Sequence, residues 1–275
     1  MIVDYHMHLR RGLVGSSEEV DHTPAAVGPY LETAAARGVD EIGFTEHVYY
    51  FRQTREIWIN EYERQRCVHD LDLYCDTILA AKRQGLPVKL GLEVDYVGDR
   101  QERLTELLAG YPWDFLLGSV HYIGTLAIDQ QPGIWATDSV EDAWRRYVLA
   151  LSELAESGSV DVLAHPDLPK IFSQRPGPAA LAELHEQIAE TAARTGVALE
   201  ISTAGLRKPV GELYPDRPLL RACVERGVPI TLASDAHLPH DVGLDLDQAV
   251  AFAREGGCET VSVFDGRQAR QEALG

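Results

Sequence analysis

The sequence predicts an α/β fold in which parallel strands close into a barrel, and three observations support it. Apolar, strand-like runs alternate with helix-like segments along the whole 275-residue chain. The strands are rich in Val, Ile and Leu without polar alternation, which indicates burial on both faces and hence a parallel sheet. Polar residues able to bind metal follow nearly every strand, and a barrel gathers all its strand ends around one mouth. An open doubly wound sheet is the alternative.

The elements follow one another in a regular order. The first helix has Thr23 as N-cap and Pro24 at its first position. A later helix begins at Ser139, with Asp142 at the spacing of a capping box. The expected strands are residues 2–5, 41–45, 88–94, 115–122, 160–164, 197–202 and 229–234, and residues 260–264 form a last apolar run. The expected helices are residues 23–37, 69–84, 101–109, 139–158, 178–195, 219–226 and 245–255.

Glycines mark the ends of four of these helices, at Gly38, Gly85, Gly196 and Gly227. A glycine at this position takes the left-handed conformation that turns the chain back toward the next strand. Segments 49–68 and 124–138 are the two long insertions, and residues 49–66 are expected to be too polar for a core. Long loops of this kind often recognise substrates. The length suits a single domain spanning residues 1–275.

Composition narrows the class of protein. The sequence contains no apolar run long enough to span a bilayer and no signal-peptide pattern, so a cytoplasmic protein is expected. The net charge of −18, with no basic cluster, argues against a nucleic-acid partner. The four cysteines, Cys67, Cys75, Cys223 and Cys258, show no C-x-x-C spacing and are expected to be reduced thiols. Oligomeric state cannot be inferred.

A pair of histidines, His6 and His8, ends the first predicted strand. Residues two apart in an extended chain point to the same face, so both imidazoles face one way. Such a pair can chelate a transition metal. Two polar surface residues would give the same local pattern, so a metal site requires further ligands at the ends of the other strands.

Further imidazoles and carboxylates stand at the ends of the later strands, and six of the ten histidines occupy such positions. His69 and His185 fall in predicted helices, where surface or packing roles are expected, whereas His22 and His240 fall in loops. The strand-end set consists of His6, His8, Glu46, His47, Glu93, His121, His165, Glu200, Asp235 and His237. So many ligand-type side chains on different turns of one fold predict a metal site.

The donor types indicate the metals and the chemistry. Imidazoles and carboxylates suit Zn, Fe or Mn. One ion needs about four to six donors, so eight strong candidates imply two or three divalent ions. Ions of this kind lower the pKa of bound water and stabilise charge on an attacked phosphoryl group. Phosphate-monoester hydrolysis is among the slowest uncatalysed reactions, and such a centre is suited to it.

The order of these motifs resembles the polymerase-and-histidinol-phosphatase (PHP) family of metal-dependent phosphoesterases, over nearly the whole chain. The motifs are Asp4-Tyr-His-Met-His8, Phe44-Thr-Glu-His47, Gly91-Leu-Glu93, Gly118-Ser-Val-His121, Ala164-His-Pro-Asp167 and Ala233-Ser-Asp-Ala-His237. The resemblance implies a distorted (β/α)7 barrel with a three-metal centre at the carboxyl ends of its strands. It also implies catalytic roles for Glu93, Asp235 and His237.

The resemblance also implies how the ligands divide. His6, His8, Glu93 and Asp235 would hold one metal; Glu93, as a bridge, His121 and His165 the second; and His47 and His237 the third. Many relatives have a further histidine soon after the first pair. This chain has none there, and Glu18, Glu19 or His22 is a possible substitute.

A second stretch, Glu200-Ile-Ser-Thr-Ala-Gly-Leu-Arg-Lys-Pro209, resembles the histidinol-phosphatase branch of the family, which typically has Asn where Ser202 stands. Arg207 could bind phosphate through a bidentate guanidinium, or could form a salt bridge at the rim. Lys208 could be a solvated neighbour. Glu200 could orient Arg207 or the amine of the substrate.

The sequence therefore predicts hydrolysis of a small anionic phosphate ester, L-histidinol phosphate, to histidinol and phosphate. A metal-bound water, Asp167 or His240 could protonate the leaving group, and His240 could also contact the substrate. The alternatives are a PHP phosphoesterase with another phosphomonoester or phosphotyrosine substrate, a nuclease or proofreading module, and a non-catalytic metal-binding protein.

Overall fold

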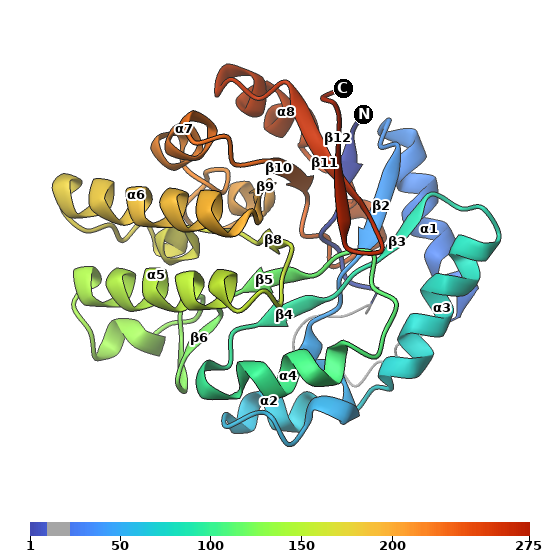
Figure 1. The fold of residues 1–275 in the computed structure, drawn as a ribbon, viewed down its shortest axis with the longest axis horizontal. Coiled ribbons are helices and arrows are strands. Elements are labelled where there is room, and N and C mark those ends of the chain that lie inside the picture. Colours follow the sequence, from blue (N-terminus) through green and yellow to red (C-terminus); the bar gives the residue numbers. More distant parts are fainter. Residues whose placement is uncertain (10–22) are drawn as a thin grey trace.

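The computed structural model describes residues 1–9 and 23–275 as an α/β fold with parallel sheets (Figure 1). One sheet has three parallel strands in the order β1-β2-β3, and the other has five in the order β10-β9-β8-β5-β4. These strands are β1 Val3–Asp4, β2 Glu41–Phe44, β3 Val88–Leu90, β4 Glu93–Asp95, β5 Leu117–Ser119, β8 Val162–Leu163, β9 Ala198–Ser202 and β10 Ile230–Ala233.

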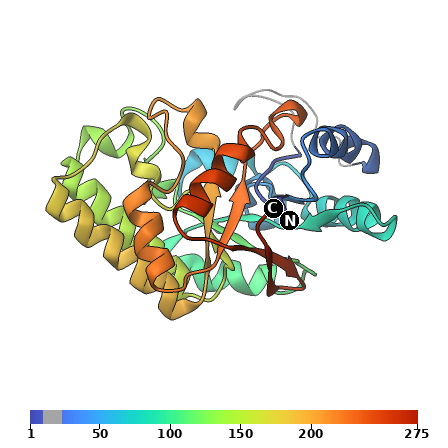
Figure 2. The same ribbon diagram turned by 90° about the horizontal axis from the view of Figure 1, so that it is seen from above.

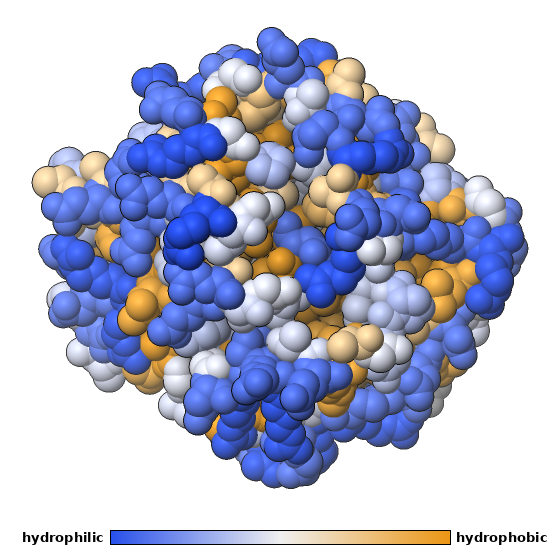
Figure 3. All heavy atoms as spheres, in the orientation of Figure 1, coloured by the Kyte–Doolittle hydropathy of each residue, from blue (hydrophilic) through white to orange (hydrophobic). Residues whose placement is uncertain are grey.

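The helices surround the strands in Figure 1, and the same layering is visible from above in Figure 2. They are α1 Pro24–Ala36, α2 Glu61–Arg66, α3 Leu71–Arg83, α4 Gln101–Leu108, α5 Val140–Glu156, α6 Pro178–Thr195, α7 Arg217–Glu225 and α8 Leu246–Glu255. No helix among the described residues is both long and apolar enough to cross a membrane. The face seen in Figure 3 is mostly hydrophilic, and apolar residues are visible mainly in its recesses.

Isolated parallel bridges join the two sheets on both sides. Met7 bridges Ala236, just beyond β1 and β10, and His47 bridges Glu93 at the start of β4. The Tyr5 N–H also donates to the carbonyl of Leu232 at 3.0 Å. These bridges bring the segments that follow β1, β2 and β10 together.

The predicted strand 88–94 is two strands, because the chain leaves one sheet at Leu90 and enters the other at Glu93. Gly91 lies at this change. A Cβ on Gly91 would lie 2.8 Å from the Phe115 ring, and one on Gly43 would lie 2.7 Å from it. Phe115 stacks on Tyr5 with ring centroids 4.9 Å apart, so an aromatic core fills the space that the two glycines leave.

The helix ends largely match their predictions. The Asp142 N–H donates to the Ser139 hydroxyl at 3.1 Å, as expected for a cap. Gly38, Gly85 and Gly196 have φ of 70°, 78° and 76°, and Gly227 follows the same pattern. Thr23 is the N-cap of α1 and Pro24 follows it at the start of the helix, as predicted, although the Thr23 side chain makes no capping hydrogen bond with the described residues.

The end of the chain and residues 49–66 hold features that the sequence did not predict. The last apolar run forms β11 Thr260–Asp265, which pairs in antiparallel fashion with β12 Gln268–Ala273, a polar segment without a strand-like pattern. Residues 49–66, expected to be too polar for a core, bury Phe51 and Trp58 at 0% and 2% exposure. The charged residues of this segment lower its mean hydropathy, so the average does not reveal the buried aromatic residues.

The ends of other elements also differ from expectation. Predicted strand 115–122 is only three residues long, and a small hairpin follows, formed by β6 Tyr122–Ile123 and β7 Leu126–Ala127. His69 lies before α3, where Asp70 is the N-cap, rather than inside a helix. His185 does lie within α6, where it is buried and serves packing.

Candidate metal centre

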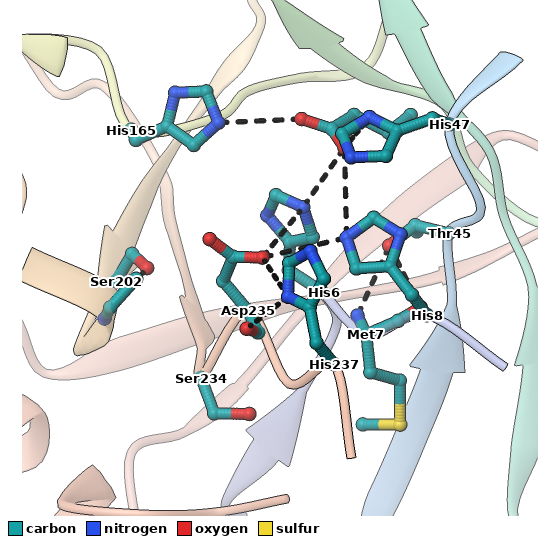
Figure 4. A network of polar contacts seen from close by, with 12 residues as sticks. His6, Met7, His8, Thr45, His47, His165, Ser202, Ser234, Asp235 and His237 are labelled. Atoms are coloured by element: carbon teal, nitrogen blue, oxygen red, sulfur yellow. Dashed lines mark hydrogen bonds and ion pairs between the residues drawn. The ribbon is translucent and has the colours of Figure 1, made fainter. Parts of the chain in front are cut away.

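Eight side chains from six strand ends converge in the structure. The imidazoles of His6, His8 and His237 gather around Asp235, and His47 and His165 lie above them on opposite sides of the view (Figure 4). The ligand-type atoms fall into four groups of three, with every atom in a group within 4.8 Å of the others. The groups are His8/His47/His237, His6/His8/Asp235, His6/Glu93/His165 and His47/Glu93/His121. Together they contain all eight predicted metal ligands.

Glu93 lies at the centre of this arrangement and is fully buried. Its Oε2 lies 2.7 Å from His47 Nδ1 and 3.3 Å from His6 Nε2. Its Oε1 lies 3.3 Å from His165 Nε2 and 3.5 Å from His121 Nε2. Each carboxylate oxygen therefore has two imidazoles within 3.5 Å, and His8 Nε2 lies 3.7 Å from Oε2. This arrangement suits a bridging ligand.

Several polar atoms of the cluster are buried without a hydrogen bond. They are His6 Nε2, His8 Nδ1 and Nε2, His47 Nδ1, Glu93 Oε2 and His165 Nδ1. Buried polar atoms are normally satisfied, so a concentration of unsatisfied nitrogen and oxygen atoms indicates an atom or ion between them. Nitrogen and carboxylate donors without sulfur fit a divalent transition metal.

Two further carboxylates contact two of the imidazoles at Nδ1, the ring nitrogen that does not face Glu93. Glu200 Oε2 lies 2.8 Å from His6 Nδ1, and Asp95 Oδ1 lies 2.6 Å from His121 Nδ1. The other oxygen of Glu200 accepts the backbone N–H of His165 at 3.0 Å. Carboxylates in this position orient metal-binding histidines and fix their tautomer. Sequence analysis missed Asp95, although its spacing from Glu93 matches that of His6 and His8.

The electrostatics of the cluster favour a cation. Burial raises the pKa of Glu93, but His47 and His6 outweigh it and hold that pKa well below its usual range. Burial lowers the pKa of His6 and His121, yet neighbouring carboxylates raise the His6 pKa well above normal and that of His121 to about 10. Positive charge is therefore stabilised among these carboxylates, as protons or as metal ions.

Two of the candidate metal ligands have an unfavourable backbone conformation. His165 and Asp235 adopt positive φ angles of 28° and 53°, which non-glycine residues rarely adopt. Fully buried Asp4 accepts the Ser234 N–H at 2.8 Å and the Gly243 N–H at 2.7 Å, which fixes the loop that carries Asp235. Strain at such positions is typical of functional sites.

A cavity of about 300 Å³ opens beside the cluster. Aromatic, apolar and charged side chains share its wall, and cluster residues form one side of it. Its lining includes His47, Tyr50, Tyr62, Glu93, His121, Tyr122, Asp129, His165, Phe172, Lys208, Tyr214, Asp235 and His237. The mixture suits a small ligand that has both a charged and an aromatic part.

The three predicted substrate-binding residues do not line this cavity. Arg207 does not line the cavity; its guanidinium donates to the carbonyl of Ser234. Lys208, which the sequence suggested could be a solvated neighbour of Arg207, does line the cavity. Glu200 is buried against His6 rather than Arg207, and His240 has a side chain 75% exposed outside the cavity wall.

Asp167, a candidate general acid, is fully buried and lies 2.8 Å from Lys170 Nζ. It also accepts the backbone N–H of Asp216 at 2.8 Å and is not part of the cavity wall. These contacts argue against proton donation to a substrate. Glu18, Glu19 and His22, the possible substitutes for a missing ligand, lie outside the described residues.

Comparison with known proteins gives consistent results. The PHP domain family model matches residues 4–204. A probable histidinol-phosphatase of Deinococcus radiodurans is 33% identical over 260 residues, covering 93% of this chain and 94% of that protein. A probable histidinol-phosphatase of Schizosaccharomyces pombe is 24% identical over 262 residues, covering 89% and 85%.

The fold is similar to that of a solved structure. The crystal structure of histidinol phosphate phosphatase from Lactococcus lactis, complexed with zinc, L-histidinol and phosphate, aligns with a TM-score of 0.76. The alignment covers 98% of each chain at 22% sequence identity. The whole length of this chain therefore shares the fold of that protein.

Proposed function

The chain belongs to the PHP domain family, and from this premise we propose that it hydrolyses L-histidinol phosphate to L-histidinol and phosphate. The observation that carries the proposal is the buried carboxylate of Glu93 with four imidazoles around its two oxygens. Two relatives that match nearly the full length of the chain are named probable histidinol-phosphatases. The substrate is thus a small anionic phosphate ester.

The finer architecture is part of this proposal. The bridges that join β1 to β10 and β2 to β4 support a distorted (β/α)7 barrel, with the metal centre at the carboxyl ends of its strands. Residues 1–275 form one phosphoesterase domain. The cytoplasmic location stays a prediction.

We propose that the centre binds two or three divalent ions of Zn, Fe or Mn. Both His121 and His165 face the same oxygen of Glu93, which supports the second of the expected sites. His8 lies close to His47 and His237 and could complete the third. The proposed ligands are His6, His8, His47, Glu93, His121, His165, Asp235 and His237. Bound ions would supply a nucleophile from water at neutral pH and stabilise charge on the phosphoryl oxygens.

The chain's own residues position the reaction. Glu200 accepts a hydrogen bond from His6 Nδ1–H, and Asp95 accepts one from His121 Nδ1–H. The Nε2 atom of each imidazole is then free to bind a metal ion. Burial raises the pKa of Asp235, but His6 and then His8 and His237 outweigh it and hold that pKa well below normal. Lys208, which lines the cavity, adds a smaller contribution in the same direction. Lys208 is thus suited to bind the phosphate, whereas a phosphate contact from Arg207 stays a prediction. Among the proposed catalytic residues, His237 has a side chain 46% exposed at the cavity, where a substrate can reach it.

The test uses purified, metal-loaded protein with L-histidinol phosphate, p-nitrophenyl phosphate and a single-stranded oligonucleotide. We expect a preference of well over a few-fold for histidinol phosphate in kcat/KM. The Glu93→Gln variant should lose activity, while Glu106→Gln, an exposed control on α4, should retain it. Elemental analysis of the untreated protein would identify its metals.

Each alternative has its own outcome. Equal activity on both monoesters would favour a phosphatase with a different small substrate. Cleavage of the oligonucleotide would favour a nuclease. Full metal occupancy without any activity would favour a non-catalytic metal-binding protein.

A further inference from the structure

A second cavity, of about 330 Å³, lies apart from the metal centre. Five parts of the chain form it: the segment before α2, α2 itself, the turn after β4, β6 with its turn, and α5. It falls within the size range of small-molecule sites, about 300–1,000 Å³. Its lining includes Ile57, Trp58, Ile59, Glu63, Tyr96, Val97, Asp99, Ile123, Arg146, Leu149, Ala150 and Glu153.

We propose that this cavity binds a small organic monocation, in which a protonated amine is attached to an apolar body. The inference does not depend on the activity proposed above, because no step in it involves the metal centre. It rests on one buried carboxyl group, on the charge of the cavity and on the apolar surface around it.

Glu63 is the buried carboxyl group. Its residue is only 4% exposed, and within the described part of the chain its carboxyl group has neither a hydrogen bond nor an ion pair. Burying a carboxyl group without a partner in the protein is unfavourable, so a water or a ligand within the cavity must supply one. Burial, and then the charge of Asp95, raise the pKa of Glu63 to about 8. A cation in the cavity would stabilise the ionised form.

The other charges of the cavity also favour a cation. Asp99 and Glu153 line the same wall, so three carboxyl groups face one guanidinium. That guanidinium, on Arg146, donates to Asp138 at 2.6 Å, and its charge is therefore largely compensated. An anionic ligand would meet an excess of negative charge here.

The remaining wall is apolar. Trp58 contributes a buried indole whose N–H already donates to Thr54 at 2.9 Å, so the ring offers only its apolar surface. Ile59 and Leu149 are each 54% exposed, which is unusual for large apolar side chains in this protein. An inorganic cation would leave this surface uncovered, whereas the body of an organic amine would cover it.

The cavity is distinct from the catalytic one. Tyr122 lines both, but Glu63 lines only the second cavity, whereas six of the eight proposed metal ligands line the first and none lines the second. A carboxylate in the catalytic cavity, Asp129, also has a buried oxygen without a hydrogen bond. An amine could bind there instead, so the experiment must separate the two positions.

The experiment titrates 2-phenylethylamine and tryptamine into the metal-loaded full chain, by calorimetry and by tryptophan fluorescence. 2-Phenylethanol, a neutral analogue, is the ligand control. The variants are Glu63→Gln, which removes the charge, and Leu149→Trp, which narrows the cavity at a half-exposed position. Glu61→Gln, exposed on the same helix, and Asp129→Asn are the matched controls. Circular dichroism verifies the fold of each variant.

We expect the amines to bind with one site per chain, at least tenfold more tightly than 2-phenylethanol. Glu63→Gln should lower the affinity tenfold or more and Leu149→Trp should weaken binding, whereas the two controls should leave it unchanged. Loss of binding in Asp129→Asn with retention in Glu63→Gln would place the amine in the catalytic cavity and overturn the proposal. Absence of saturable amine binding, or equal affinity for the alcohol, would overturn it as well.

Discussion

Replacing Glu200 with glutamine tests how the centre is organised, because the substitution preserves shape and removes one acceptor. Glu200 now accepts two donors, one on each oxygen: His6 Nδ1–H at 2.8 Å and the His165 backbone N–H at 3.0 Å. Glutamine has one acceptor oxygen and one donor NH₂ group. If its oxygen stays on His165, the NH₂ faces His6 Nδ1, and the imidazole must move its proton to Nε2, the atom that faces Glu93. If the amide turns around, His165 loses its backbone hydrogen bond.

The expected cost follows from the role of such partners. Replacing a residue that orients a metal-binding histidine typically lowers metal affinity or activity about 10- to 100-fold. Since each tenfold change is about 1.4 kcal/mol, the loss is about 1.4–2.8 kcal/mol. Competition with a chromophoric chelator measures metal affinity directly, and kcat/KM for histidinol phosphate measures the functional consequence.

Two further variants make the result interpretable. Asp95→Asn should weaken the centre by a comparable factor, because Asp95 holds His121 at 2.6 Å in the same way. Glu190→Gln, exposed on α6, should change nothing. If Glu200→Gln bound metal within twofold of the unaltered protein, with its fold intact, the reasoning about tautomers would be refuted.

Four other predictions concern stability. Lys170→Met should cost about 3–5 kcal/mol in urea unfolding, because it leaves the buried carboxylate of Asp167 unpaired, and the double variant with Asp167→Leu should recover most of it. Glu63 keeps its proton up to about pH 8 when folded but loses it near 4.5 when unfolded, so folding stability should fall as pH rises between these values. The stability advantage of Glu63→Gln in urea unfolding should therefore be absent near pH 4 and reach a few kcal/mol above pH 8. Gly91→Ala should cost about 1–3 kcal/mol by the same measurement, because its Cβ would lie 2.8 Å from Phe115. Chelation should lower the thermal midpoint, and free metal at 100 times its Kd should restore about 2.7 kcal/mol; an unchanged midpoint would argue against a metal centre.

The alternation of elements and the ligand set could be predicted because both depend on local patterns. A residue such as Gly196 marks a helix end through its own conformational preference, and His6 and His8 share a face through the strand period alone. The convergence of the eight candidates followed from one further rule, that parallel strand ends lie together. The structure brings those eight within reach of one another.

Residues whose role depends on packing could not be predicted in the same way. Whether Arg207 or Lys208 faces the cavity depends on how the short turn after β9 is held against Ser234. Asp167 and His240 stand close to ligand residues in the sequence, but burial against Lys170 and exposure to solvent set their surroundings. Glu200 was recognised as important, but its partner is 194 positions away in the chain.

The contact between β1 and β10 has a consequence for how the protein folds. Asp4 and Ser234 are 230 positions apart and yet share a hydrogen bond in the fully buried interior. Contacts so distant along the chain close a very long loop and tend to slow folding. During synthesis His6 and His8 leave the ribosome long before their partner Asp235. The centre therefore cannot assemble on a partial chain, and a cation that links the two edges would stabilise the step that completes the fold.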